Sequence, residues 1–444
     1  MRIKEFKIKN QHKNFENLEI DISKCDGVAA FIGDNASGKS NLLEALSALF
    51  KNIYLDEKDE FEYYLEYVTF SENVIKIVSD KNKRVYAVDG NPVHDIKKYL
   101  PKRVVAVYSG EENRLWKKNY EPLYLKYIDE IIKDFNLDYP RMLFLNKFYW
   151  HIILLCLIIS EADDVKEFVK DKLGIFKINE IKFHFFKANY NKYKNNPALN
   201  LIRKLDSKNS YTIDEFKKTI SDNDSIDYNI TDIFQALYVA YTPKDVKIID
   251  EIEITFNDDL NLSMLSEGQK KLLLIKATLE FASSEDTLVL LDEPDAHIHI
   301  GNKQEIVKVF EPYKDTRQII LTTHSPTLTQ SLKDYNVFML ANGEIINHNR
   351  QNIINELTND FWSKHRQNLF LASNKDVILL VEGKHDKKHI SNAFNKLKKD
   401  FQGLDFDIFS LKGEKNIAPM LRGLRDANLN DNKIYIGIYD NDSA

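Results

Sequence analysis

The sequence predicts an α/β protein: a parallel sheet, a helix-rich insertion within it, and a second, smaller α/β domain toward the C-terminal end. Three observations support this prediction. Residues 28–32 form an apolar run, and a glycine-containing loop and a helical pattern follow, as in the first strand–helix unit of a parallel sheet. Residues 287–291 and 318–322 are continuous apolar runs, which is typical of central parallel strands. Residues 376–381 repeat the pattern of a buried strand after a linker near residue 372.

The bulk composition is that of an ordinary globular protein. The chain has 444 residues, enough for two or three domains, with 43% apolar and 29% charged residues. A formal net charge of -6 argues against a uniformly basic coat for nucleic acid, so DNA contact requires a local patch or bridging metal ions. Cys25 and Cys156 are too few for a disulfide framework and suit a reducing cytoplasm, where we expect the protein to act. The N-terminus lacks the hydrophobic segment of a signal peptide.

Residues 1–110 are expected to form the N-terminal lobe of the main domain. Apolar residues first alternate with polar ones, which predicts short strands, and then recur at helical spacing. The predicted strands are residues 3–8, 18–22, 28–32 and 104–108, and the predicted helix is residues 41–50.

Residues 111–245 change character and are expected to form a helical insertion, available for dimerisation or DNA contact. The apolar run 148–159 is too short to span a bilayer and contains His151, so it predicts a buried helix and no membrane association. Residues 176–204 interleave basic and aromatic side chains, which suits nucleic-acid binding by phosphate contact and stacking. The alternative is an amphipathic strand and helix with a solvated lysine face, which is the commoner origin of such a pattern.

Residues 246–370 return to an α/β pattern and are expected to form the C-terminal lobe of the main domain. Residues 371–444 form the second domain, whose predicted elements are a strand, a lysine-rich helix and a last strand, at 376–381, 385–397 and 433–439.

The loop Gly33-Asp-Asn-Ala-Ser-Gly38-Lys39-Ser40 has the pattern G-x-x-x-x-G-K-S between a predicted strand and a predicted helix. Its glycines let backbone N–H groups wrap a phosphate, Lys39 reaches the β- and γ-phosphates, and Ser40 ligates Mg²⁺. The N-terminus of the following helix adds positive potential. We therefore expect ATP and Mg²⁺ to be bound here, with ATP held by Gly33, Asn35, Gly38, Lys39, Ser40 and Asn41.

The apolar run 287–291 ends in Asp292-Glu293-Pro. An acidic residue at the end of a central strand can hold Mg²⁺, and we assign this role to Asp292 together with Ser40. The next carboxylate, Glu293, can polarise the attacking water as a general base. The alternative is an ordinary strand-end acid, which the phosphate loop makes the weaker interpretation.

Residues 265–269, Leu-Ser-Glu-Gly-Gln, resemble the signature motif of ABC-type ATPases. Ser266 and Gly268 stand at the start of a predicted helix, where a hydroxyl and N–H groups can meet a phosphate, with Gln269 beside them. The resemblance implies that this motif faces the phosphate loop of a second copy, so that ATP bridges two copies. The other interpretation is a helix N-cap formed by Ser266, and the two interpretations are compatible.

Thr322-Thr-His324-Ser-Pro follows the next predicted strand, and the resemblance makes His324 a contact of the γ-phosphate. The four motifs span residues 1–345 and together resemble the soluble ABC ATPases of the RecF, Rad50 and SMC type, which act on DNA. That family usually has a glutamine between the phosphate loop and the insertion, and the matching residues 105–112 contain none. Either another residue couples the γ-phosphate to the insertion, or the matching segment lies elsewhere.

Two predicted strands of the second domain end in acidic residues: Glu382, with Asp386 soon after it, follows the first, and Asp440 and Asp442 follow the last. Such carboxylates can gather Mg²⁺ or Mn²⁺, and two such ions stabilise both the attacking and the leaving oxygen of a phosphodiester. The arrangement resembles the Toprim domain of topoisomerases, primases and certain nucleases, and residues 413–416 resemble the G-x-x-N element of Toprim nucleases. The resemblance makes all four carboxylates metal ligands, and Glu382, Asp440 and Asp442 catalytic.

An ABC head before a Toprim domain resembles the OLD-family nucleases, named from "overcoming lysogenization defect", which include anti-phage effectors of the Gabija and retron systems. The resemblance implies an ATP-hydrolysing, metal-dependent DNA endonuclease, with ATP and Mg²⁺ at the head and Mg²⁺ or Mn²⁺ at the Toprim site. It implies a homodimer or higher homo-oligomer through the ABC heads, DNA as a partner, and an accessory defence protein or nucleic-acid-containing complex. The sequence ends two residues after Asp442, so we expect an incomplete Toprim domain.

The alternative is a non-cleaving ABC ATPase that binds DNA or a partner protein, with the Toprim segment as a docking element. An ABC transporter ATPase is disfavoured by the C-terminal carboxylates and by the opening strand, which is like that of RecF.

Overall fold

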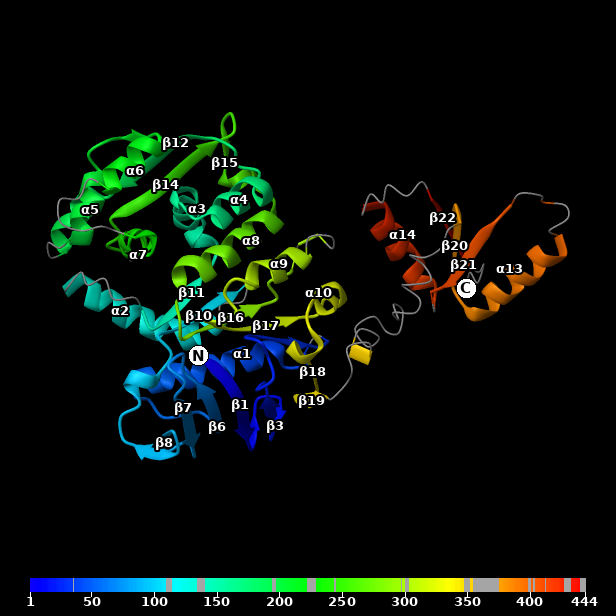
Figure 1. Cartoon of the computed structure of the whole chain (residues 1–444), viewed down its shortest axis with the longest axis horizontal. Coiled ribbons are helices and arrows are strands. Elements are labelled where there is room, and N and C mark those ends of the chain that lie inside the picture. The colour runs from blue at the N-terminus through cyan, green and yellow to red at the C-terminus, as the bar shows by residue number, and fades with distance from the viewer. Residues whose placement is uncertain are drawn as a thin grey trace. The chain divides into compact units, whose positions relative to one another are not determined.

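The computed structural model describes most of the chain as two compact units, Met1–Asn347 and His348–Ala444, each of which is treated by itself below (Figure 1). The described residues are 1–34, 36–108, 114–133, 140–193, 197–221, 229–242, 245–296, 298–299, 303–346, 352–353, 375–397, 401, 404–411, 413–426 and 433–439. The domain boundary predicted between residues 370 and 371 lies outside them.

The first unit is built on a sheet that, in the described part of the chain, has seven strands in the order β11-β10-β16-β17-β5-β18-β19. Neighbours from β11 to β18 are parallel, and β19 is an antiparallel edge strand. Every residue of β5, β16 and β17 is buried, which explains their continuous apolar sequences and confirms these predicted strands. The strands are β5 (Val28–Ile32), β10 (Arg103–Tyr108), β11 (Met142–Leu145), β16 (Thr287–Asp292), β17 (Gln318–Thr323), β18 (Val337–Ala341) and β19 (Glu344–Ile346).

The register of the three central strands brings the predicted motifs to one edge of this sheet. Asp292 at the end of β16 lies opposite Thr322, and Thr323 at the end of β17 lies opposite Ile32 at the end of β5. The loops that leave these strands therefore start side by side at the carboxyl edge, which is where open α/β sheets bind ligands.

A second, antiparallel sheet packs with the first around one helix. Among the described residues it has six strands in the order β4-β1-β6-β7-β8-β9, and Figure 1 shows helix α1 between the two sheets. One apolar core contains residues of both sheets and of α1, which explains why this helix is buried along most of its length. The elements are β1 (Arg2–Lys9), β4 (Glu19–Asp21), β6 (Glu62–Val68), β7 (Val74–Ser79), β8 (Arg84–Val88), β9 (Asn91–Val93) and α1 (Lys39–Leu55).

Helix α1 is longer at both ends than the predicted 41–50. It starts directly after Gly38 and ends directly before Asp56, and both of these flanking residues have left-handed backbone conformations. These positions, rather than the apolar spacing inside the helix, set its limits.

The predicted helical insertion, residues 111–245, also contains strands, so that prediction was incomplete. β11 joins the edge of the central sheet, and β12 pairs with β14 in a third sheet, ordered β13-β12-β14-β15 within the described residues. The strands of this third sheet are β12 (Ile178–Phe185), β13 (Ser210–Tyr211), β14 (Ile249–Phe256) and β15 (Leu260–Asn261). The helices are α2 (Glu121–Lys133), α3 (Trp150–Ile159), α4 (Asp163–Glu167), α5 (Pro197–Leu205), α6 (Ile213–Ser221) and α7 (Ile230–Tyr241).

The basic and aromatic residues of 176–204 lie partly on β12, whose two faces differ. Phe183 is buried and stacks on Phe185 and Phe216, whereas Lys182 points away from the core and pairs with Glu180. This is the amphipathic strand of the second interpretation, and it leaves Phe183 unavailable for stacking on bases.

The apolar run 148–159 forms the buried helix α3, as predicted, packed against α7, α8 and β14. Across the residues that the structure describes, no helix has the length and apolar character needed to cross a membrane. The remaining helices of the first unit follow the strands of its C-terminal lobe, and Figure 1 shows α8 and α9 on the face of the central sheet opposite α1. They are α8 (Glu267–Ala277), α9 (Lys303–Phe310) and α10 (Pro326–Ser331).

The second unit is a smaller α/β fold whose described strands form a parallel sheet in the order β21-β20-β22. Figure 1 shows helices α13 and α14 on opposite sides of this sheet. The strand and helix predicted at its start and the strand predicted at its end are confirmed. The elements are β20 (Val377–Val381), α13 (Lys384–Leu397), β21 (Phe406–Ser410), α14 (Ile417–Asp426) and β22 (Ile434–Ile438).

Candidate functional site

The phosphate loop runs from the end of β5 into α1, as the sequence predicts. Lys39 is buried inside it, and its Nζ donates to the carbonyl oxygens of Gly33 and Asp34, each at 2.8 Å. Gly33 passes so close to β18 that an added Cβ would lie 2.1 Å from a carbonyl oxygen, and Gly38 has φ of +109°. Burial lowers the pKa of the Lys39 amine below its ordinary value. The neighbouring carboxylates act in the opposite direction but have the smaller effect. Asn35 lies outside the described residues.

Two predicted magnesium ligands meet at the start of α1. Ser40 Oγ lies 3.1 Å from Asp292 Oδ2, and Thr322 on β17 also donates to this carboxylate. Asp292 is 6% exposed, and burial raises the pKa of its carboxyl, while the hydrogen bonds from Thr322 and Ser40 lower it. A hydroxyl and a carboxylate beside a phosphate loop are hard oxygen ligands, so these residues fit Mg²⁺.

The predicted general base and the predicted γ-phosphate contact lie together. Glu293 Oε1 is 3.2 Å from His324 Nδ1, although the two residues follow different strands. The backbone of Glu293 is held in a left-handed conformation, φ +47°, by its N–H, which donates to the carbonyl oxygen of Thr322 at 3.1 Å. A strained residue fixed in this way beside a binding loop is typical of a functional site.

A network that the sequence analysis did not identify supports this pair. Lys303 Nζ donates to Asp295 at 2.8 Å and to Ser325 Oγ at 3.0 Å, and Thr323 Oγ1 donates to Asp295 at 2.7 Å. These contacts fix the loop that carries Glu293 to the loop after β17. Asp295 stands in the same short acidic stretch as Asp292, so its position was a signal; nothing in the local sequence pointed to Lys303.

Asn41 follows Ser40 on α1, and its side chain forms hydrogen bonds with Asn14 and Arg114. Its Nδ2 donates to Asn14 Oδ1 at 2.7 Å, and its Oδ1 accepts from Arg114 Nη2 at 3.2 Å. Of residues 105–112, where the family's glutamine was sought, residues 105–108 lie on β10 and the rest lie outside the described residues.

The signature segment forms a helix N-terminus. Ser266 caps α8 in a reciprocal capping box with Gln269: Ser266 Oγ accepts from the Gln269 N–H, and Gln269 Oε1 accepts from the Ser266 N–H. The N-cap interpretation is therefore confirmed, and the phosphate role of Ser266 and Gly268 stays a prediction. Gln269 Nε2 also donates to the carbonyl oxygens of Lys172 and Leu173, which ties the signature segment to the insertion.

A pocket of about 360 Å³ lies at this helix N-terminus, lined by Ser266, Gly268 and Gln269 with Lys172 and His299. Its lining includes no residue of the phosphate loop, so in one copy the signature segment opens to a space of its own.

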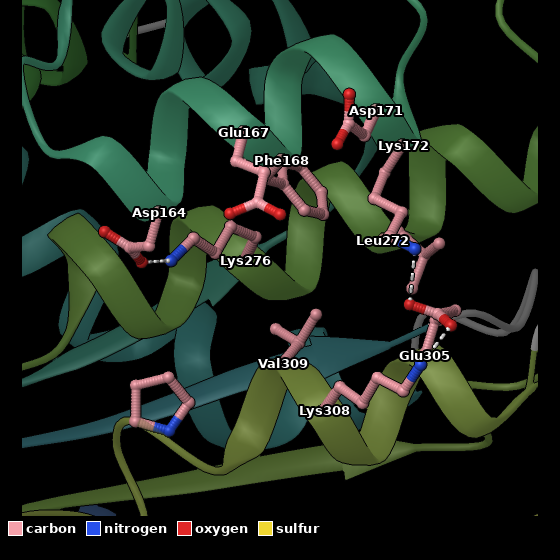
Figure 2. A pocket seen from close by; sticks show the side chains of 11 residues that line it. Asp164, Glu167, Phe168, Asp171, Lys172, Leu272, Lys276, Glu305, Lys308 and Val309 are labelled. Carbon is pink, nitrogen blue, oxygen red and sulfur yellow. Dashed lines mark hydrogen bonds and ion pairs between the residues drawn. The ribbon is translucent and has the colours of Figure 1, made fainter.

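A second cavity of about 350 Å³ separates the insertion from the helices of the C-terminal lobe (Figure 2). Figure 2 shows two ion pairs that bridge it: Lys172 to Glu305 on α9 at 2.7 Å, and Lys276 on α8 to Asp164 on α4 at 2.6 Å. Lys276 is buried, so its ammonium depends on this partner and on Glu280. These bridges fix the insertion to α8, which begins at the signature segment, and to α9.

In the second unit, Glu382 follows β20 and Asp386 lies in the first turn of α13. Asp386 Oδ2 accepts from the Gly383 N–H at 2.6 Å, and the carbonyl oxygen of Glu382 accepts from the Gly413 N–H at 2.8 Å. The predicted G-x-x-N element therefore lies beside the predicted metal ligand. β22 pairs with β20 so that both strands end at the same edge, but Asp440 and Asp442 lie outside the described residues.

A further group of possible metal ligands, not singled out from the sequence, lies on the third sheet. Ligand atoms of His184, Glu251 and Glu253 are within 4.8 Å of one another, and all three residues are exposed. His184 Nε2 lies 3.2 Å from Glu253 Oε1, and such a surface pair accounts for the group without an ion.

Comparisons with known proteins agree with the head and its motifs. Residues 144–329 match the family model described as "AAA domain, putative AbiEii toxin, Type IV TA system", a stretch that includes Ser266, Asp292 and His324. The "DNA replication and repair protein RecF" of Clostridium botulinum is 22% identical over 380 residues, covering 78% of this chain and all of that protein. "Retron Vc95 probable ATPase" of Vibrio cholerae is 24% identical over 373 residues, covering 71% of this chain and 69% of that protein.

Among solved structures, the SMC head domain from Thermotoga maritima aligns over 78% of this chain and 98% of that chain, with 16% identity and a TM-score of 0.36. The matching family model and the similarity to RecF are those of an ATPase domain, in agreement with the motifs at the carboxyl edge of the central sheet.

Proposed function

We propose that the chain is an ATP-hydrolysing, metal-dependent DNA endonuclease of the OLD type, in which the nucleotide state of the head controls a nuclease site in the second unit. The observation that carries the hydrolytic part is the contact between Glu293 and His324 at the sheet edge that also holds Lys39, Ser40 and Asp292. Each of these side chains has the chemistry that one step of phosphoryl transfer to water requires.

In the proposed reaction, Lys39 leaves the carbonyl oxygens of Gly33 and Asp34 and binds the β- and γ-phosphates. Ser40 and Asp292 would hold Mg²⁺, which neutralises charge that develops on the phosphate oxygens. Glu293 accepts a proton from the attacking water, and His324 orients the γ-phosphate. The fixed backbone of Glu293 supports this assignment, because a general base must be held in place before the water arrives.

We propose that hydrolysis needs two copies of the chain, as a homodimer or a higher homo-oligomer through the heads. Ser266 and Gly268 line a pocket that contains no phosphate-loop residue, so a second copy is needed to bring ATP to them. The capping box does not prevent this role: the N–H groups in the first turn of a helix, such as that of Gly268, have no partner within the helix.

For the nuclease site, we propose that Glu382, Asp386, Asp440 and Asp442 bind Mg²⁺ or Mn²⁺ and position a DNA phosphodiester. Glu382 and Asp386 lie at the edge where β20 and β22 both end, which supports the first half of this set. The names of the relatives mention DNA repair and a retron, which supports DNA as a partner and a role in anti-phage defence, alone or with an accessory defence component.

The test is to incubate the purified chain with supercoiled plasmid and Mg²⁺ or Mn²⁺, with and without ATP, beside an Asp440→Ala variant. Nicking by the wild type that is absent from the variant supports the nuclease, and its dependence on ATP gives the sign of the coupling. Nicking that survives in the variant points to another metal site or to a contaminant, and rejects the assigned ligand set.

The second candidate is a non-cleaving ATPase that binds DNA or a partner protein, with the second unit as a docking element. The similarities favour it in one respect: the family description and the names of the relatives given above are those of an ATPase, a toxin and a repair protein. Intact ATP hydrolysis without nicking under any metal would select this candidate.

A further inference from the structure

A buried carboxylate on the phosphate-loop helix is held between two cations. Glu44 lies in the second turn of α1, and its side chain is only 5% exposed. Lys13, from the segment between β1 and β4, pairs with Glu44 Oε2, and Arg114 Nε donates to Oε1 at 2.6 Å. A carboxylate this well buried requires such partners, so both cations are tied to α1.

Hydrogen bonds connect this cluster to the phosphate loop. Arg114 Nη2 donates to Asn41, Asn41 donates to Asn14 at 2.7 Å, and Asn14 Nδ2 donates to the carbonyl oxygen of Ser37 at 3.2 Å. Asn14 also lies so close to Gly38 that an added Cβ there would be 2.3 Å from Asn14 Nδ2. A rearrangement of the loop at Ser37 or Gly38 around a triphosphate therefore acts directly on the side chain of Asn14, because that side chain contacts both residues.

On its other side, the cluster connects to the helical path that leads into the insertion. Arg114 is helical, and the helix continues through residues 116–120 into α2. Within that path, Asn119 donates to the carbonyl oxygen of Glu44 at 3.4 Å, and the hydroxyls of Tyr120 and Ser47 lie 3.2 Å apart. Further along, Tyr124 in α2 donates to the carbonyl oxygen of Thr242 at the end of α7 at 2.8 Å.

From this continuous set of contacts, we propose that Arg114 is the positioning residue that transmits the occupancy of the phosphate loop to the insertion, with Glu44 as its anchor. The inference rests on the proposed nucleotide binding at that loop. When the loop closes on a triphosphate and Lys39 leaves its carbonyl partners, Asn14 and Asn41 change their hydrogen bonds. Arg114 contacts both Asn41 and Glu44 on α1, so the helical segment that contains Arg114 shifts with α1. Arg114 acts through these neighbours rather than on the reacting atoms.

The test compares the full-length wild type with Arg114→Met, which keeps the length of the side chain and removes both contacts. The matched control is Lys118→Met, because Lys118 lies on the same helical path and pairs with Glu60 at 2.6 Å on the exposed surface. Three readouts are measured with Mg²⁺ and a non-hydrolysable ATP analogue or ATP: analogue affinity, hydrogen exchange of residues 114–133 with and without analogue, and kcat.

The expected result for Arg114→Met is a protein that still folds, because Lys13 continues to pair with Glu44. Its analogue affinity should stay within about threefold of the wild type, the analogue-induced change in hydrogen exchange over 114–133 should be lost, and kcat should be lower by about 3- to 30-fold, the range found for coupling networks of this kind. Lys118→Met should behave as the wild type in all three readouts. Arg114→Lys should restore part of the exchange response, since an ammonium can keep Glu44 but not Glu44 and Asn41 together.

The outcomes separate this inference from the proposed function. A wild type that binds no nucleotide overturns the proposed function, and this inference with it. A wild type that binds the analogue, beside an Arg114→Met variant with the same exchange response and kcat, overturns the role of Arg114 alone. If the Arg114→Met variant is unstable, Arg114→Lys still decides: a response that is clearly smaller than that of the wild type in a stably folded Arg114→Lys supports the role of Arg114, and a full response refutes it.

Discussion

Replacement of the proposed general base by its amide, Glu293→Gln, should separate ATP binding from ATP hydrolysis. Glutamine keeps the size of the side chain. It can still form a hydrogen bond with His324, whose Nδ1 lies 3.2 Å from Glu293 Oε1 in the wild type. The left-handed backbone is held by the contact of the residue's own N–H with Thr322, which the substitution leaves in place. The local geometry should therefore survive, and only the ability to accept a proton is lost.

The expected loss follows from that single change. A positioned general base contributes about 10²–10⁴-fold, so kcat should fall by this factor, equivalent to about 3–5 kcal/mol in the activation free energy. ATP affinity should stay within about threefold of the wild type, because the substitution removes no phosphate contact. A substitution that removes no important contact changes a free energy by only about 0.5 kcal/mol.

The assay is phosphate release under saturating ATP, with affinity measured separately by titration of a fluorescent ATP analogue. Glu311→Gln is the control, since Glu311 is half exposed and pairs with Lys314 away from the sheet edge. A kcat for Glu293→Gln within about threefold of the wild type would refute the reasoning, because it falls far below the contribution of a positioned base. The base would then be another residue.

Four further perturbations test other parts of the site and the fold. Lys39→Ala should abolish ATP binding, measured by the same titration, because it removes the buried cation of the phosphate loop; tight binding by this variant would reject the site. Ser266→Ala should lower the free energy of unfolding by about 1 kcal/mol through loss of the N-cap, measured in urea, and should reduce ATP hydrolysis more than ATP binding by one head. Asp292→Asn should abolish Mg²⁺-dependent hydrolysis, yet in a chelator it should raise the free energy of unfolding at pH 7. Burial raises the pKa of the Asp292 carboxyl in the folded state above its unfolded value, so the wild type loses stability as the pH rises through the folded-state pKa. The variant has no carboxyl at this position and does not lose this stability. Asp59→Ala should lower the free energy of unfolding by about 3–5 kcal/mol, because Asp59 is 2% exposed and is the carboxylate partner of Arg84, whose side chain is itself only 10% exposed; urea curves equal to those of the wild type would show that Arg84 finds another partner.

Local sequence patterns were sufficient for the parts of the fold in which neighbours along the chain decide the structure. The buried strands β5, β16 and β17 carry continuous apolar sequences, and the loops after them carry the motif residues, so their common edge follows from the rule for parallel sheets. The contact of Glu293 with His324 is of this kind, since each residue directly follows its strand.

Pairings between distant segments were the part that the sequence did not reveal. β12 pairs with β14, and the described residues between them include four helical segments. The apolar and basic residues of β12 fit a strand or a helix until that partner is known. The contact of Arg114 with Glu44 joins residues 70 positions apart, and neither stands in a recognisable motif. The second acidic site was predicted from strand ends alone, and the structure describes its Glu382 and Asp386 half.

The dual use of the signature segment gives a physical reason for coupling between two heads. Gln269 caps α8 with Oε1 and holds the insertion with Nε2, through the carbonyl oxygens of Lys172 and Leu173. Lys172 in turn pairs with Glu305 on α9 across the cavity of Figure 2. If ATP on one copy binds the signature segment of another, the phosphate meets the same helix turn that anchors the insertion. The insertion then receives the nucleotide signal twice, from its own phosphate loop through Arg114 and from the partner's ATP through Gln269. Loss of either contact alone should therefore weaken the response of the insertion, and loss of both should remove it.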